Sequence, residues 1–276
     1  MVNTYKIKHL TIIGLGLEQK FSHRFTGTIW NMTPTPNANL LVLEVRDEEN
    51  FIARFSAFDL EHNEFLWRNL ELDEKWWVSL VTASDGLALL QTFQSSGNPE
   101  RKDLIAIDLS RGQVKWKAQK FALYACGEEG FILGYDSTQE LMKATVDART
   151  GEVSIGNWRS GVVNPAEVTK SPVTYAEGED HFEQVKEFVQ KRRNEHITRG
   201  VEYLELGDRI LLSYYVANGE FLANYLLVTD NDGKELLHEK LGENLHGLGV
   251  HTFFALRDCV IFVKNKCELV SYSLYD

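Results

Sequence analysis

The feature that most constrains this chain is a short sequence unit that recurs along it. The clearest copy, LIAIDLSRGQVKW, begins at Leu104: an apolar run ends in Asp108, a turn closes at Gly112, and a second run carries Trp116. Two strand-like runs joined through a glycine turn predict a β-hairpin. A repeated hairpin predicts a fold built from many similar strands, so the repeat has to be interpreted before any single motif.

The same arrangement recurs around three more aspartates, and Ser273 takes the place of the aspartate near the end of the chain. One copy has Asn63 where the others have glycine, and asparagine also tolerates a positive φ. A carboxylate at the start of such a turn can accept hydrogen bonds from its backbone amides. We therefore interpret these aspartates as structural residues of the turns: Asp59, Asp108, Asp147 and Asp230.

The spacing of these positions is close to the length of a propeller blade. Successive positions are 49, 39, 83 and 43 residues apart, against roughly 40–50 residues for a blade. Two more strand-like runs precede each unit, which gives four strands per repeat. We predict an all-β, five-bladed propeller over residues 1–276, with six blades as the alternative.

The long spacing of 83 residues holds either a degenerate blade or an insertion. We favour an insertion at residues 158–198, because its second half, 176–196, has the apolar periodicity of a helix. Its apolar face would carry Phe182, Val185, Phe188 and Val189. The last repeat lacks a fourth strand, which residues 20–25 could supply to close the ring.

The run LIAIDLSRGQVKW and the turn Arg149–Gly151 resemble the repeat of pyrroloquinoline-quinone-type propellers. The resemblance covers the second half of four blades and implies the propeller fold. The quinoenzymes are longer, eight-bladed and exported, so we transfer neither their cofactor nor their calcium site, and we predict no cofactor and no metal. The chain also resembles an uncharacterised bacterial propeller family of about this length, which implies no function.

The charge balance excludes some classes of partner. With 29 basic and 40 acidic residues the net charge is −11, which opposes binding to nucleic acid and to anionic membranes. No apolar run approaches the ~20 residues that span a bilayer, and the first ten residues, MVNTYKIKHL, lack a signal-peptide pattern. We predict a cytoplasmic monomer without nucleic-acid or membrane partners.

Several weaker motifs have simpler explanations. Gly14 and Gly16 follow an apolar run, but Gln19 stands where a dinucleotide loop needs its third glycine. The histidines His238, His246 and His251 lack the spacing of a known metal motif, so we interpret them as ordinary histidines. The three cysteines, Cys126, Cys259 and Cys267, are irregularly spaced and predict buried thiols rather than a disulfide framework.

The first strand of each blade lines the channel of a propeller, and these strands supply the candidate ligand-binding residues. The candidates are Trp30, Trp76, Trp77, Tyr124, Glu202, Tyr203 and His251. The rings either pack between blades as core or form a surface on which an apolar or sugar face stacks.

Three functional hypotheses follow. The first is a non-catalytic propeller that binds a partner protein or a small ligand at its channel mouth. The alternative is a hydrolase acting on a sugar or lactone, in which Glu202 and a loop carboxylate such as Asp208 lie about 5–10 Å apart. The third is that the apolar face of the insertion helix docks another protein or a second copy.

Overall fold

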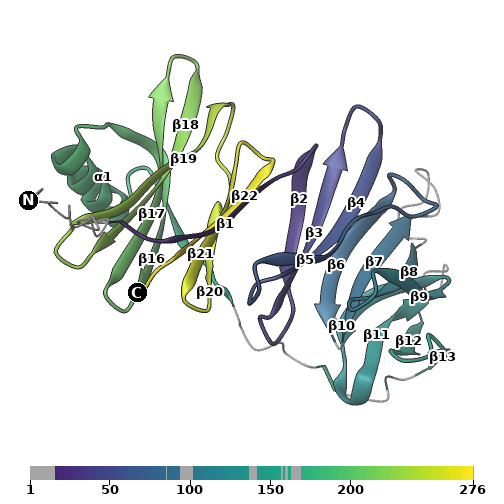
Figure 1. The fold of residues 1–276 in the computed structure, drawn as a ribbon. Helices are drawn as coiled ribbons and strands as arrows, with labels where there is room; N and C mark the ends of the chain where they lie inside the picture. Colours follow the sequence, from purple (N-terminus) through teal and green to yellow (C-terminus); the bar gives the residue numbers. More distant parts are fainter. Residues whose placement is uncertain are drawn as a thin grey trace, which may run out of the picture. The chain divides into compact units, whose positions relative to one another are not determined.

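The computed structural model describes residues 16–84, 86–93, 102–136, 142–156, 158, 161–162 and 169–275. The described strands form five antiparallel sheets, accompanied by one α-helix and one short 3-10 turn (Figure 1). The predicted all-β class with one helix is confirmed. The number of blades and the closure of a ring stay predictions. Gly14 and the first ten residues lie outside the described residues, and Gln19 begins a β-strand.

The chain divides into two compact units, which we describe separately. Unit 1 contains Val173–Val250 together with short segments from both ends of the chain. Unit 2 contains Lys20–Pro172 and His251–Ser271.

Unit 2 contains four sheets, which we name A to D. Sheet A has the order β1-β22-β21-β20-β14, and its first and second strands each extend by one or two residues into unit 1. Sheets B, C and D are meanders of four consecutive strands each. The strands of sheet A are β1 (Gln19–Arg24), β14 (Thr169–Lys170), β20 (Phe253–Leu256), β21 (Cys259–Lys264) and β22 (Glu268–Ser273). Those of sheet B are β2 (Thr28–Pro34), β3 (Leu40–Asp47), β4 (Ile52–Asp59) and β5 (Glu64–Leu70). Sheet C has β6 (Val78–Ser84), β7 (Leu87–Phe93), β8 (Lys102–Asp108) and β9 (Gln113–Ala118). Sheet D has β10 (Phe121–Cys126), β11 (Phe131–Asp136), β12 (Lys143–Asp147) and β13 (Val153–Ile155), with the 3-10 turn at Glu128–Gly130.

The four sheets of unit 2 pack face to face in the order A, B, C, D. One hydrophobic cluster joins sheets A and B around Phe58 and Ile261. A second joins B and C around Phe55, and a third joins C and D around Phe121. The middle strands of each meander are buried on both faces, which explains their nearly continuous apolar runs.

The aspartates of the repeat bond to the turns that follow them. The Oδ1 atom of Asp108 accepts from the amides of Ser110 and Arg111 at 2.9 and 3.2 Å. Asp147 does the same for the second and third residues after it, at 2.8 and 3.0 Å, and these bonds lower the pKa of its carboxyl. Asp59 and Asp230 also accept from the amides of their own turns.

The tryptophans of the repeat cover the turn of the next sheet. Trp67 of sheet B lies against Gly112, where an added Cβ would be 2.6 Å from the indole Cγ. Its Nε1 donates to the Leu109 carbonyl at 2.7 Å. Trp116 of sheet C covers Gly151 of sheet D in the same way. Both glycines have φ near +70°, a conformation that favours glycine. Each also lies so close to an indole ring that a Cβ would collide with it.

Unit 1 consists of a fifth sheet, sheet E, and the helix. The order is β15-β16-β17-β18-β19, with strands β15 (Val173–Ala176), β16 (Ile197–Leu206), β17 (Arg209–Asn218), β18 (Phe221–Asp230) and β19 (Glu235–Leu245). Helix α1 (Asp180–Arg193) packs on this sheet through Phe182, Val185 and Val189 (Figure 1). It ends at Asn194 in the left-handed conformation, which is a usual helix stop. The region 158–198 therefore contains β14 and β15 as well as the helix.

Candidate functional site on the inner strands

The first strands of sheets B, C and D share a β-bulge. The pairing register shifts between Ile29 and Asn31 in β2, and at the corresponding places in β6 and β10. A bulge leaves one residue without a direct partner on the neighbouring strand. The three residues left over are Trp30, Val81 and Tyr124, and we refer to them as the bulge row.

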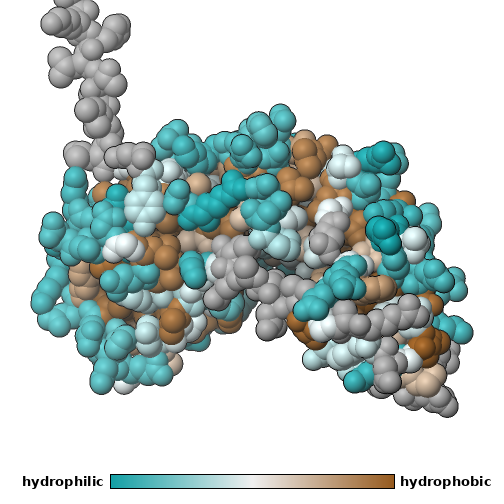
Figure 2. Space-filling model, turned by 90° about the horizontal axis from the view of Figure 1, so that it is seen from below, coloured by the Kyte–Doolittle hydropathy of each residue, from teal (hydrophilic) through white to brown (hydrophobic). Residues whose placement is uncertain are grey.

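Each bulge turns an apolar side chain outward. Trp30, Val81 and Tyr124 are 60%, 39% and 56% exposed. The residue before each of them packs in a core between sheets. Figure 2 shows how hydrophobic residues reach the surface in small groups among hydrophilic ones on the face it presents. Three successive sheets thus expose an apolar group at an equivalent position, which marks a candidate contact surface.

The Trp30 ring lies beside a buried ion pair. The Arg46 guanidinium is 5.2 Å from the centre of the Trp30 ring and 4.8 Å from that of Trp76. Arg46 Nε donates to Glu44 Oε1 at 2.7 Å, and Glu44 Oε2 accepts from the Leu80 amide at 2.7 Å. A buried pair with its remaining hydrogen bonds satisfied holds its geometry firmly. It ties β3 to β6 and gives the exposed indole a rigid, cationic support.

Tyr124 belongs to a second aromatic group, in sheet D. Its ring stacks on Trp158 at 4.9 Å and meets Tyr135 edge-on at 5.9 Å. The Lys143 ammonium lies 4.5 Å from the centre of the Trp158 ring. Both ends of the bulge row therefore combine an exposed aromatic face with a nearby positive charge.

Two of the candidate tryptophans lie before their strand and not on it. The sequence predicts Trp76 and Trp77 on the first strand of sheet C, but β6 begins at Val78. Glu74 Oε1 accepts from the amides of both tryptophans at 2.9 and 2.8 Å, so a carboxylate-capped turn holds this segment. Trp77 is 50% exposed there.

Glu202, Tyr203 and His251 also lie at positions other than those the sequence predicts. Glu202 and Tyr203 lie on β16, which is not the first strand of sheet E, because β15 pairs with it. Glu202 is completely buried and belongs to unit 1. His251 precedes β20 and has a φ of +52°. The expected placement failed because the inserted region supplies an extra strand to both sheets, β14 to sheet A and β15 to sheet E.

The structure does not favour the hydrolase alternative. Asp208 lies in the turn after β16 and pairs with Arg209 at 2.6 Å. Glu202 is four residues from the end of β16, which is roughly 13 Å along the strand. Glycosidases hold their two carboxyls about 5–9.5 Å apart. The apolar face of α1 is likewise occupied, because sheet E covers it.

Other reactive groups have structural surroundings. His238 lies 2.9 Å from the Tyr214 hydroxyl and stacks on Tyr225. The three cysteines are partly buried thiols, and burial raises the pKa of Cys259. Within the described ranges, no three or more His, Cys, Asp or Glu side chains converge in a way that could hold a metal ion. None of the helices in that part of the chain has the length and apolar character to cross a bilayer.

One family matches part of the chain. Residues 35–116, which run from just before β3 into β9, are similar to a family described as "Domain of unknown function (DUF4905)". No curated protein matches the sequence.

Solved structures resemble the chain over most of its length at low identity. BamB from Moraxella catarrhalis is 10% identical with a TM-score of 0.33, covering 93% of this chain and 99% of that one. The β-propeller domain of the Trilobed protease from Pyrococcus furiosus is 10% identical with a TM-score of 0.35, covering 90% and 84%. An oligogalacturonate lyase in complex with manganese is 11% identical with a TM-score of 0.32, covering 92% and 90%. Similarity at this level assigns no function to this chain.

Proposed function

We propose that this chain is a non-catalytic binding protein whose partner contacts the bulge row of unit 2. The observation that carries the proposal is the repetition itself. Sheets B, C and D each expose an apolar side chain at the same bulge, and exposed apolar groups that recur together mark interaction sites. A partner with an apolar or aromatic surface would bury all three groups.

The surroundings of the row suit such a contact. Tryptophan and tyrosine contribute large contact areas with few rotatable bonds, and they dominate binding energy at many interfaces. Arg46 fixes Trp30 before any partner arrives, so little ordering remains to be done on binding. A partner protein or a small ligand would both satisfy this chemistry.

Site-specific photo-crosslinking in the full-length chain tests the proposal. A benzophenone amino acid replaces Trp30 in one variant and Val114 in a second. Val114 is 40% exposed on β9 and serves as an apolar control outside the row. We expect a defined crosslinked partner from position 30 that is absent from position 114.

The partner identified in this way is then purified and titrated against the chain. The double substitution Trp30→Ala and Tyr124→Ala should weaken binding at least tenfold, and Val114→Ala should leave it unchanged. Equal crosslinking from both positions, or a double variant that binds normally, would rule out the bulge row as the contact surface.

A further inference from the structure

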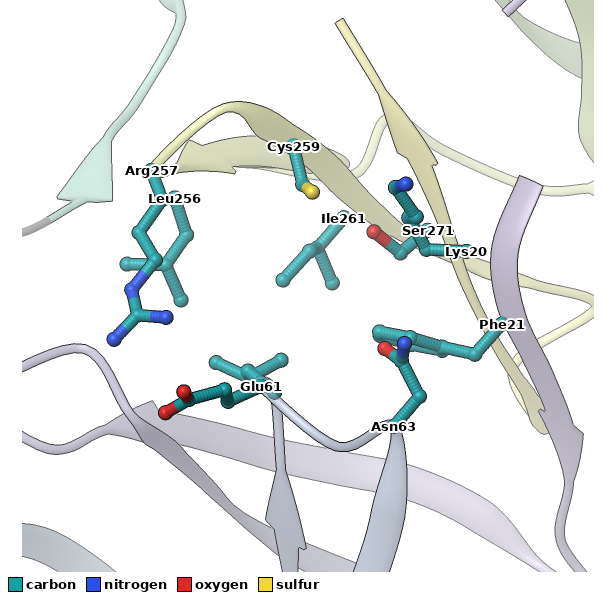
Figure 3. Close-up of a pocket in the computed structure, with 10 residues that line it drawn as sticks. Lys20, Phe21, Glu61, Asn63, Leu256, Arg257, Cys259, Ile261 and Ser271 are labelled. Atoms are coloured by element: carbon teal, nitrogen blue, oxygen red, sulfur yellow. The ribbon is translucent and has the colours of Figure 1, made fainter. Parts of the chain in front are cut away.

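A cavity of about 180 Å³ lies in unit 2 between sheets A and B (Figure 3). Its apolar walls are Phe21, Leu60, Leu256 and Ile261. The exposed side chains of Glu61 and Arg257 also line it. The cavity lies against the turn of sheet B that begins at Asp59, and three residues of this turn line it.

The equivalent turns of sheets C and D are covered by indole rings. Trp67 donates its ring N–H to the carbonyl of Leu109, the residue after the turn aspartate. Trp116 donates to the carbonyl of Ala148, which holds the same position in sheet D. In sheet B the corresponding carbonyl is that of Leu60. Asn63, with a φ of +55°, takes the place of the glycine.

The residue that should cover the sheet B turn is a phenylalanine. Phe21 lies on β1, which neighbours β22 in sheet A, and it lines the cavity together with Ser271 of β22. Trp67 and Trp116 lie opposite alanines at the same point of sheets B and C. A phenyl ring is smaller than an indole and has no N–H. Within the described part of the chain no donor bonds to the Leu60 carbonyl.

The inner end of the cavity carries a second polar group. Ser271 is completely buried, and its hydroxyl has no oxygen or nitrogen partner among the described residues. The Cys259 thiol lies beside it, and their interaction opposes the rise in the thiol's pKa that burial causes. In Figure 3 the Ser271 hydroxyl points toward the side of the cavity where Cys259 and Ile261 lie. A buried polar group without a full partner is costly and uncommon in a protein interior.

We propose that this cavity binds a small planar aromatic molecule with a ring N–H, of which indole is the simplest example. The ring of the ligand occupies the space that corresponds to that of Trp67 between sheets B and C and of Trp116 between sheets C and D. Its N–H donates to the Leu60 carbonyl. The volume is sufficient, since an apolar cavity of roughly 150 Å³ binds benzene. The site is separate from the bulge row and does not depend on the proposed function.

The test uses 5-fluoroindole observed by fluorine NMR with the full-length protein. We expect saturable binding, with displacement by unlabelled indole. N-methylindole keeps the ring but lacks the donor, and it should bind at least tenfold more weakly. N-acetyltryptophanamide distinguishes a free ring from one carried on a peptide: displacement by it would assign the site to a tryptophan side chain of a partner.

Substitutions locate the site. Phe21→Trp introduces an indole like those of Trp67 and Trp116, and its ring would fill the cavity. It should therefore abolish binding and raise the melting temperature. Phe51→Trp adds an indole at a position 62% exposed and should leave binding unchanged. If Phe21→Trp does not fold, Cys259→Met provides a second test. It narrows the cavity from the side of β21 and leaves Phe21 unchanged, and it should weaken binding at least tenfold. Absence of binding to the wild-type chain, equal binding of N-methylindole, or normal binding by both cavity variants would overturn the proposal.

Discussion

The two units cover the same turn in different ways. In unit 2, an indole from the neighbouring sheet lies on the turn glycine, as Trp67 does on Gly112. In unit 1, the helix supplies the cover: Gly233 faces Phe188 and Arg192 of α1. In both cases a side-chain N–H donates to a carbonyl of the turn, from Trp67 to Leu109 at 2.7 Å and from Arg192 to Asp232 at 3.0 Å.

The comparison shows that the turn itself sets a requirement that the sequence can meet in more than one way. A glycine with positive φ leaves a flat backbone surface, and the turn exposes carbonyls that need donors. Stacked sheets bring an outer strand over the next turn, so one tryptophan is sufficient. Sheet E carries its own helix, which covers the turn with the Phe188 ring and with Arg192, whose charged and flexible end is more easily displaced.

The largest effect is expected where the indole cover is removed. Trp116 is 8% exposed and bonds to Ala148 at 2.9 Å, so Trp116→Ala should lower the free energy of unfolding by about 3–5 kcal/mol. Urea unfolding of the purified chain measures it. Trp77→Ala, at a position 50% exposed, is the matched control and should change stability by about 0.5 kcal/mol or less. Equal effects of the two substitutions would show that the cover contributes nothing specific.

A smaller effect on the free energy of unfolding distinguishes the Trp67 cover of Gly112 from the α1 cover of Gly233. Gly112→Ala and Gly233→Ala both place alanine at a positive φ, which costs about 1–2 kcal/mol. At Gly112 the new Cβ also meets Trp67 Cγ at 2.6 Å, whereas at Gly233 its nearest neighbour is the end of the Arg192 side chain at 2.9 Å. Overpacking against the ring adds about 1–3 kcal/mol.

We therefore expect Gly112→Ala to be the more damaging of the two by at least about 1 kcal/mol in urea unfolding. Gly219→Ala, where an added Cβ meets nothing, gives the cost of positive φ alone. If Gly112→Ala equalled Gly219→Ala, the indole would have to move without cost, and the distinction between the two covers would fail.

Much of the fold was predictable because the repeat is local. The aspartate, the glycine and the tryptophan of each unit lie within thirteen residues, and the hairpin they form depends mainly on those residues. The helix was predictable for the same reason: Phe182, Val185 and Val189 recur with helical spacing. Its predicted ends extended beyond the observed Asp180–Arg193, because strand β15 and the cap at Asn194 interrupt the pattern.

The candidate site was less predictable, because it depends on pairing between distant strands. Nothing near Glu202 indicates that β15 will pair with β16, so its burial could not be foreseen. The sequence does not predict the bulge row as a row. It marks Trp30 and Tyr124 as candidate aromatic residues, but Val81 resembles a core residue until the register shift is known. The Asn63 turn and Phe21 are 42 residues apart, and only strand pairing shows that they meet where an indole is absent.

The smallest effect concerns pH and distinguishes the two covers by their chemistry. The end of α1 is held to sheet E by polar contacts: Arg193 pairs with Glu235 at 2.6 Å, and the Tyr214 hydroxyl donates to Glu195 at 2.6 Å. Because the Tyr214 hydroxyl hydrogen is used in the bond to Glu195, the Tyr214 oxygen can only accept from His238 Nε2, which lies 2.9 Å away. Burial, together with the nearby charge of Arg193, lowers the pKa of His238. The indole covers of unit 2 contain no titrating group.

The sign of the pH effect follows from that lowered pKa. The folded state keeps His238 neutral where the unfolded chain already binds a proton, so stability is full above the ordinary value of 6.5 and falls as the pH drops below it. Amide hydrogen exchange, corrected for intrinsic rates, should show protection of residues 180–193 decreasing between pH 7 and pH 5. His238→Gln retains a donor for Tyr214 but cannot titrate, so it should remove most of that decrease.

The turn amides of Gly112 and Gly151 provide the internal reference, since their indole covers are neutral over this range. Unit 2 also contains a histidine with a lowered pKa, His23, which is why the comparison uses local exchange and a variant of His238 rather than the global melting temperature. A helix whose protection falls equally in the wild-type chain and in His238→Gln would mean that other groups control its docking. The helical cover would then differ from the indole cover in shape alone and not in its response to protons.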